Sequence, residues 1–208
     1  MPKPPHLCPL GFADQLFPAG SHICQIYSDD EERIDSSLGF LESGLKNGEK
    51  TACFNRKLDD SALAERLQQR GLSVSSLTGS KALTRAETSE VYFKDGCFSP
   101  EHMLGLLRQF YEDSVTEGFT AARVIGEMIA EIRAMKGGNR LMEYESRVSL
   151  QMRTYPVTAV CQYDANAFDG ATIMQVLKVH PLMVIRGTVV HNPYFIPPEE
   201  YLKQFPAN

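Results

Sequence analysis

Short apolar runs and helical stripes alternate along most of the chain. Five apolar runs, at residues 22–27, 50–55, 119–125, 156–163 and 182–190, have the length and composition of buried strands. Between them, apolar residues recur at intervals of three and four positions, which places them on one side of a helix. Strands that alternate with helices predict βαβ units. We therefore expect a three-layer α/β sandwich with a mainly parallel central sheet.

Capping residues mark where several of these helices begin and end. Asp29 and Asp30 follow the first strand and are available as N-caps, and Gly48 stands just past the end of the next apolar stripe. Ser99 followed by Pro100 predicts another helix start, because Pro is favoured at the first helical position. The helix boundaries can therefore be placed from local signals.

The remaining stretches are less regular. Residues 1–21 are rich in Pro and are expected to form an arm or loop. Residues 72–98 are expected to form a small strand pair or an excursion, with a strand at 81–88, and the Pro-rich tail after residue 191 a segment that wraps over the sheet. These expectations give an N-terminal arm at 1–21, a single domain at 22–202 and a tail at 203–208.

Composition narrows the class of protein. The 208 residues carry a net charge of −5, and Lys and Arg are not clustered, so direct binding to nucleic acid is not expected. There is no apolar run long enough to span a membrane and no signal peptide, so we expect a cytoplasmic protein. Five scattered cysteines predict free thiols and not a disulfide framework.

Nucleotide binding is the commonest use of such a sheet, but its motif is missing. A P-loop needs glycines and a Lys between a strand and the following helix, so that backbone N–H groups bind the phosphates. Here the first strand is followed by Ser28-Asp-Asp-Glu-Glu32, whose carboxylates would repel phosphate. We therefore expect no ATP site.

A repeated pattern points to a different site. Cys24-Gln and Cys161-Gln each stand in an apolar strand and are followed by an aromatic and an acidic residue where a helix should begin. In a parallel sheet the carboxyl ends of all strands face one side, where ligands bind. The pattern predicts neighbouring strands and one site at that rim.

A metal site is an alternative interpretation of the same residues. His22 and Cys24 share one face of a strand and could form a Zn²⁺ site if two more ligands come from Cys161, His180 or the His6 and Cys8 pair of the arm. Cysteines in strands are more often small buried apolar residues, so no cofactor is the leading expectation.

Charged and aromatic residues near the strand ends add candidates. Arg123 and Glu127 bracket the end of a central strand and could either orient a ligand or pair with each other. His180 closes a helix, where a histidine is either functional or a favourable terminal charge. Tyr27 and Tyr163 could line a small apolar pocket, or simply pack in the core.

The ordered motifs of the chain resemble the MEDS family, sensory domains named for methanogens, methylotrophs and a dichloromethane-responsive regulator. The motifs that carry the resemblance are His22-x-Cys24-x-x-Tyr27, Arg123-Val-Ile-Gly-Glu127-Met128, Glu143-Tyr-Glu145, Cys161-Gln-Tyr163-Asp164 and His180-Pro181. The resemblance implies a RecA/KaiC-like fold that has lost its P-loop and a role in prokaryotic signal transduction. It also implies a ligand among simple hydrocarbon derivatives.

The resemblance and the strand-end pattern together predict a set of ligand-binding residues. They are His22, Cys24, Tyr27, Arg123, Glu127, Glu143, Cys161, Tyr163, Asp164 and His180. The function expected from them is non-catalytic sensing of a small organic molecule. The alternative is a hydrolase or transferase that uses Glu127 with Cys161 or a bound metal.

The resemblance also implies a partner. Domains of this family often lie beside DNA-binding, kinase or phosphatase modules, and none is recognised in these residues. We therefore expect the signal to pass to a separate kinase, phosphatase or transcription regulator, with no role for a membrane. A homodimer is compatible with this role.

Overall fold

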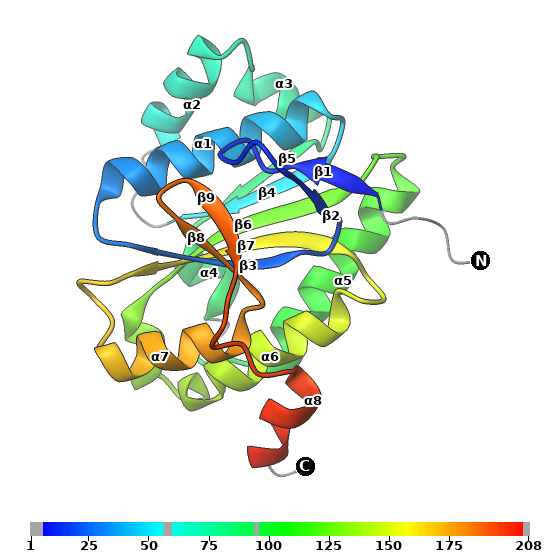
Figure 1. The fold of residues 1–208 in the computed structure, drawn as a ribbon. Coiled ribbons are helices and arrows are strands. Elements are labelled where there is room, and N and C mark those ends of the chain that lie inside the picture. The colour runs from blue at the N-terminus through cyan, green and yellow to red at the C-terminus, as the bar shows by residue number, and fades with distance from the viewer. Residues whose placement is uncertain (1–5, 56–59, 94–95, 206–208) are drawn as a thin grey trace.

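The computed structural model describes residues 6–55, 60–93 and 96–205. At its centre lies a seven-stranded sheet with the order β5-β4-β6-β7-β3-β8-β9 (Figure 1). Its strands are β3 (His22–Tyr27), β4 (Lys50–Phe54), β5 (Leu83–Ala86), β6 (Ala122–Met128), β7 (Val157–Asp164), β8 (Leu182–Ile185) and β9 (Thr188–His191). All neighbouring strands are parallel except β8 and β9. The expected mainly parallel sheet is confirmed.

Helices cover both faces of this sheet and complete the three layers (Figure 1). One face carries α1 (Asp30–Lys46), α2 (Asp60–Gln69) and α3 (Val74–Gly79). The other carries α4 (Thr88–Tyr92), α5 (Pro100–Thr116), α6 (Leu141–Gln151) and α7 (Gly170–Val179), with the short turns η1 (Ala130–Ala134) and η2 (Gly138–Arg140). Each layer buries its own apolar cluster against the sheet, so α1 and α6 lie on opposite sides of the same strands.

Local signals placed two long helices correctly. Asp29 is the N-cap of α1 and accepts a hydrogen bond from the Glu31 N–H at 2.7 Å. Ser99 caps α5 by accepting from the His102 N–H at 3.2 Å, and Pro100 occupies the first turn. Both caps satisfy N–H groups that have no partner within the helix.

The N-terminal arm contains secondary structure that its sequence did not reveal. β1 (Leu7–Pro9) and β2 (Leu16–Pro18) form an antiparallel pair that packs beside α1. The backbone of Gly11 approaches Gly39 of α1 so closely that a Cβ atom on Gly11 would lie 1.9 Å from the Gly39 carbonyl oxygen. The expectation of an arm or loop is therefore wrong for these residues.

Two further local predictions are wrong in part. The strand expected at 81–88 is present as β5, but the described residues around it form α3 and α4 and not a strand pair. The apolar run at 182–190 is a hairpin, in which Arg186 and Gly187 both adopt positive φ, 49° and 72°, as a tight two-residue turn requires. The turn was not predicted because the apolar residues on both sides of it were taken together as one strand.

The C-terminal segment packs on helices and does not wrap over the sheet. α8 (Pro198–Tyr201) and the following turn η3 (Leu202–Gln204) contact α6, and α8 also contacts α7. The Tyr201 hydroxyl donates to Gln175 Oε1 of α7 at 3.0 Å. Among the described residues, no helix combines the length and the apolar character that crossing a membrane requires.

Candidate functional site

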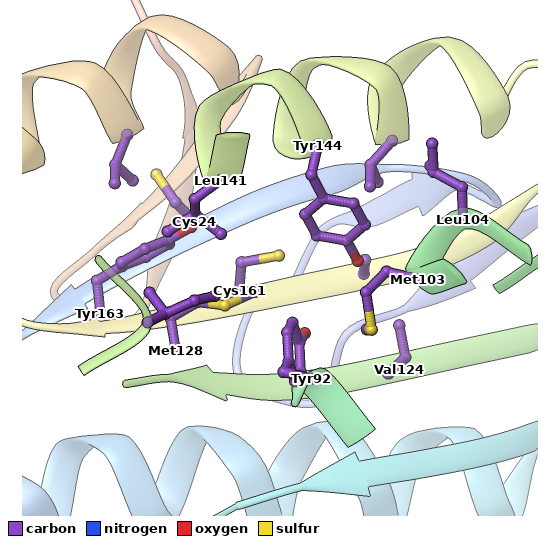
Figure 2. Close-up of a cluster of buried hydrophobic side chains, with 14 of the residues drawn as sticks. Cys24, Tyr92, Met103, Leu104, Val124, Met128, Leu141, Tyr144, Cys161 and Tyr163 are labelled. Carbon is purple, nitrogen blue, oxygen red and sulfur yellow. The ribbon is translucent and has the colours of Figure 1, made fainter. Parts of the chain in front are cut away.

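The two Cys-Gln segments lie side by side in the sheet. β3 and β7 are parallel neighbours, and the register places Cys24 beside Cys161 and Gln25 beside Gln162. Both cysteines project toward α6 (Figure 2), whereas the glutamines lie under α1. Because successive side chains of a strand point to opposite faces, the repeat forms two polar groups, one on each face of the sheet. The expectation that the two segments are neighbours is confirmed, and that of one ligand site at the rim stays a prediction.

On the α6 face, four side chains that can bind metals converge. The His22–Glu145–Cys161–His180 cluster brings together one ligand atom from each residue, all within 4.8 Å of one another. Glu145 Oε2 lies 3.2 Å from His22 Nε2, 3.5 Å from His180 Nε2 and 3.7 Å from Cys161 Sγ. All four side chains are buried. Four separate elements, β3, α6, β7 and the end of α7, supply them.

Outer hydrogen bonds fix the orientation of this cluster. His180 Nδ1 donates to the Val176 carbonyl oxygen at 2.8 Å, so its Nε2 atom points inward. His22 Nδ1 contacts the Ser149 hydroxyl at 2.9 Å, and Tyr163 donates to Glu145 Oε1 at 2.7 Å. Glu145 Oε2 is thus left facing the two imidazoles. The imidazole rings lie with centroids 4.2 Å apart.

Burial controls the protonation of these groups. Loss of solvation, together with the neighbouring His180, lowers the pKa of His22 to about 4, so its imidazole is neutral at pH 7. Burial raises the pKa of Cys24 to about 12 and also raises the pKa of Cys161, with a further contribution from Glu145. Neither thiol is therefore an activated nucleophile in the protein as it stands.

On the α1 face, the glutamines form a closed amide–hydroxyl network. Gln162 Nε2 donates to Gln25 Oε1 at 2.9 Å and to Ser37 Oγ at 3.1 Å, and Gln25 Nε2 donates to Ser36 Oγ at 2.9 Å. These groups are buried and satisfy one another. The network lies between the sheet and the middle of α1, which supplies Ser36 and Ser37.

Tyr27 and Glu127 lie beside that network at the carboxyl ends of their strands. The Tyr27 hydroxyl donates to Glu127 Oε1 at 3.0 Å, and Arg33 Nη1 of α1 lies 3.7 Å from Glu127 Oε2. The side chain of Glu127 shares its face with Ile125, and Cys161 belongs to the opposite apolar cluster. The alternative that Glu127 and Cys161 act together in catalysis is therefore wrong, because the sheet separates them.

Arg123 does not lie at the carboxyl end of β6 and does not pair with Glu127. Its guanidinium makes a two-point ion pair with Glu49, with Nε–Oε2 and Nη2–Oε1 distances of 2.6 and 2.5 Å, and donates to the Phe40 carbonyl oxygen at 3.0 Å. A four-residue step along a strand covers roughly 13 Å. Arg123 is thus an anchor at the amino end of the sheet and is removed from the candidate site.

Three other predicted residues also lie outside the four-residue cluster. Glu143 is on the outer side of α6 and pairs with Arg140 and Arg147. Asp164 closes a turn by accepting from the Asn166 N–H at 2.9 Å. The sulfur of Cys24 is not among the converging atoms. Of the predicted residues, His22, Cys161 and His180 belong to the cluster, and Tyr163 supports it.

A cavity of about 280 Å³ lies between the turns η1 and η2, the start of α6 and the first half of α7. Leu141 and Met142 give it apolar walls, and Leu141 is four residues from Glu145, so both lie on one side of α6. Figure 2 shows Leu141 on the inner side of α6, facing the strands that carry Cys24 and Tyr163. The other residues that line the cavity are Arg133, Gly138, Asn139, Ala171, Thr172 and Gln175.

Several of these participants were not predicted from the sequence. Glu145 was named only as part of the family motif, and Ser149 was not named, although both lie on the inner side of α6. Arg33 was not named either, although its side chain is buried and lies 3.7 Å from Glu127. A polar residue inside an apolar helical stripe was the available signal.

Comparison with known proteins gives a family for this arrangement. Residues 21–181 match the family described as MEDS: MEthanogen/methylotroph, DcmR Sensory domain. The transcriptional repressor DcmR of Methylorubrum extorquens (strain DSM 6343 / CIP 106787 / DM4) is 24% identical over 173 residues, which cover 76% of this chain and 57% of the repressor. The chain therefore spans little more than half the length of that relative.

Solved structures agree on the fold. The flagellar accessory protein FlaH from Methanocaldococcus jannaschii superposes with a TM-score of 0.59 at 13% identity, over 83% of this chain and 76% of FlaH. A KaiC-like protein from Pyrococcus horikoshii OT3 superposes with a TM-score of 0.56 at 10% identity, over 86% of this chain and 80% of that protein. Such low identities show a common RecA/KaiC-like fold and nothing about activity.

Proposed function

The chain belongs to the MEDS family of sensory domains, and from this premise we propose that it binds a small organic molecule and reports its presence to a separate signalling protein. A sensory role is what the family and the repressor relative have in common. The small organic ligand and the separate signalling partner are proposed here from the features below.

The observation that carries the ligand proposal is the cavity between α6 and α7. Its volume of about 280 Å³ suits a molecule of a few non-hydrogen atoms, and it combines apolar walls with a small number of polar groups. Asn139, Thr172 and Gln175 supply amide and hydroxyl groups, and Arg133 supplies a charge. Small alcohols, halocarbons and acids match this chemistry, and amines, whose charge Arg133 would repel, are the comparison class.

The same cavity offers a path for the signal. Gln175 lines the cavity and accepts the hydrogen bond of Tyr201 in α8, so a ligand that competes for the Gln175 amide would change how the C-terminal segment docks. A ligand shifts a conformational equilibrium only by its difference in affinity for the two states. Docked and released forms of α8 are the two states that we propose a partner distinguishes.

The ligand proposal predicts a thermal shift that depends on the cavity. A compound that binds the native state at about 100 times its Kd should stabilise the protein by roughly 2.7 kcal/mol, or about 5 to 10 °C in Tm. Ala171→Trp, which fills the cavity from α7, should abolish that shift. The measurement is thermal melting with the four compound classes named above.

Met174→Trp is the matched control, because Met174 is an exposed residue of the same helix and does not line the cavity. It should retain the full shift. A shift that survives in Ala171→Trp would place the ligand elsewhere, and the absence of any shift in the unmodified protein at saturating compound would contradict ligand sensing itself.

A second prediction concerns nucleotides. We expect no saturable binding of Mg-ATP at physiological concentrations, because the first turn of α1 carries Asp30, Glu31 and Glu32 and its N-terminus is already capped by Asp29. Equilibrium titration followed by fluorescence or calorimetry is the test. Micromolar affinity, or hydrolysis above the rate of a buffer control, would show that this fold has kept a nucleotide site without its motif.

A further inference from the structure

The His22–Glu145–Cys161–His180 cluster places a buried carboxylate beside two imidazole nitrogens and a thiol. The Val176 carbonyl oxygen can only accept, so His180 Nδ1 donates to it and Nε2 is directed into the cluster. His180 Nε2 lies 3.5 Å from Glu145 Oε2 and has no hydrogen-bond partner although it is buried. A buried carboxylate needs a partner of positive charge, and a metal ion bound between these atoms would supply it.

His22 is held in the same way. Ser149 Oγ lies 3.5 Å from the Val179 carbonyl oxygen and can donate to it, which leaves the hydroxyl oxygen to accept from His22 Nδ1 at 2.9 Å. His22 Nε2 is then directed into the cluster, as His180 Nε2 is. An imidazole that donates its outer N–H to a carbonyl or hydroxyl oxygen is the usual arrangement of a metal-binding histidine.

Four of the six distances within the cluster are close to those of a tetrahedral zinc site, and the other two are within 4.8 Å. Bonds of about 2.3 Å to sulfur and about 2.0 to 2.1 Å to nitrogen and oxygen give tetrahedral edges of roughly 3.3 to 3.6 Å. The separations are 3.2 Å for His22 Nε2–Glu145 Oε2, 3.5 Å for Cys161 Sγ–His22 Nε2 and 3.7 Å for Cys161 Sγ–Glu145 Oε2. The fourth, from His180 Nε2 to Glu145 Oε2, is 3.5 Å.

We infer that His22, Glu145, Cys161 and His180 form a closed four-ligand site for a divalent transition metal of the Zn²⁺ class. Binding releases the Cys161 thiol proton to solvent, and the thiolate and the Glu145 carboxylate together balance the two positive charges of the ion. Four protein ligands leave no open position, so the centre is structural and not catalytic. This inference does not depend on small-molecule sensing.

The ligand set explains what such a centre would do for the fold. Glu145 comes from α6 and His180 from the end of α7, while His22 and Cys161 come from the two central strands. An ion bound to all four would fix α6 and α7 on the sheet, and these helices form the walls of the cavity. Tyr163 would support the site from outside through its hydrogen bond to Glu145.

The test uses tag-free protein purified under reducing conditions. Elemental analysis should find about one Zn²⁺ per chain, and removal with a chelator should lower the Tm reversibly. Co²⁺ added to the stripped protein should produce intense visible bands of tetrahedral cobalt and a near-ultraviolet thiolate-to-cobalt band. Failure of the stripped protein to bind Zn²⁺ or Co²⁺, together with an unchanged Tm, would overturn the inference and leave a purely hydrogen-bonded cluster.

Two ligand variants and one matched control make the test specific. Cys161→Ala should lose the thiolate band, whereas Cys24→Ala, the same change at the neighbouring register position, should keep it. His180→Gln should keep the thiolate band but weaken Zn²⁺ binding by more than the roughly 10- to 100-fold typical of an outer-shell partner. It serves as the second readout if Cys161→Ala does not fold. Equal bands and affinities in Cys161→Ala and Cys24→Ala would exclude this site.

Discussion

Arg123→Met should lower the free energy of unfolding by about 3 to 5 kcal/mol, because it leaves the Glu49 carboxylate buried without its partner. Glu49 and Arg123 are 1% and 0% exposed, and the guanidinium bridges Glu49 and the Phe40 carbonyl oxygen. Chemical denaturation followed by circular dichroism measures the loss. Any ligand-dependent thermal shift should persist in the variant if it folds, since the pair lies at the amino end of β6, away from the cavity.

Two control variants separate burial from charge. Arg153→Met removes one partner of an ion pair with Glu199 in which both side chains are more than half exposed, and it should change stability little. The double variant Arg123→Met/Glu49→Leu should recover part of the loss, because both charges are then absent. If Arg123→Met were no more destabilising than Arg153→Met, the buried pair would not anchor the fold.

Gly44→Ala should destabilise the protein by about 1 to 3 kcal/mol, although alanine is the better helix former. A Cβ atom at position 44 of α1 would lie 2.5 Å from both Cδ and Nε of Arg123. The Arg123 side chain cannot move aside, since its guanidinium is fixed on Glu49. The absence of a side chain at Gly44 is thus what allows α1 to pack over the ion pair.

Gly105→Ala is the matched control for Gly44→Ala. Gly105 lies within α5, and a Cβ atom there would meet nothing within 4 Å. This variant should gain about 0.5 to 1 kcal/mol from helix propensity alone. Denaturation curves of the two variants should therefore shift in opposite directions, and a gain of stability in Gly44→Ala would contradict the close packing of α1 on Arg123.

The fold could be predicted because its signals are local. Periods of two and 3.6 residues, caps such as Asp29 and Ser99, and an acidic segment in place of a P-loop are all properties of short stretches. Predictions were wrong where the local signal was weak or misleading. The turn at Arg186-Gly187 interrupts an apolar run, and α4 is only five residues long.

The candidate site could be predicted only in part. Arg123 and Glu127 are four residues apart on one strand, and this spacing alone separates them by roughly 13 Å. The choice of Glu143 over Glu145 was a different error, because both lie in the same motif and only the rotation of α6 decides which faces the sheet. In the structure Glu143 pairs with Arg140 near the surface, whereas Glu145 belongs to the buried cluster with His22.

The sequence by itself determined the alternation of the main strands and helices, the mainly parallel sheet, the absence of a P-loop motif and the family. Only the tertiary structure decided which groups meet. Cys161 and His22 are 139 positions apart in the chain, and they meet because β3 pairs with β7 in a register that no short segment specifies. Residue periodicity is set within a few residues, whereas the convergence of four ligands depends on the packing of β3, β7, α6 and α7 together.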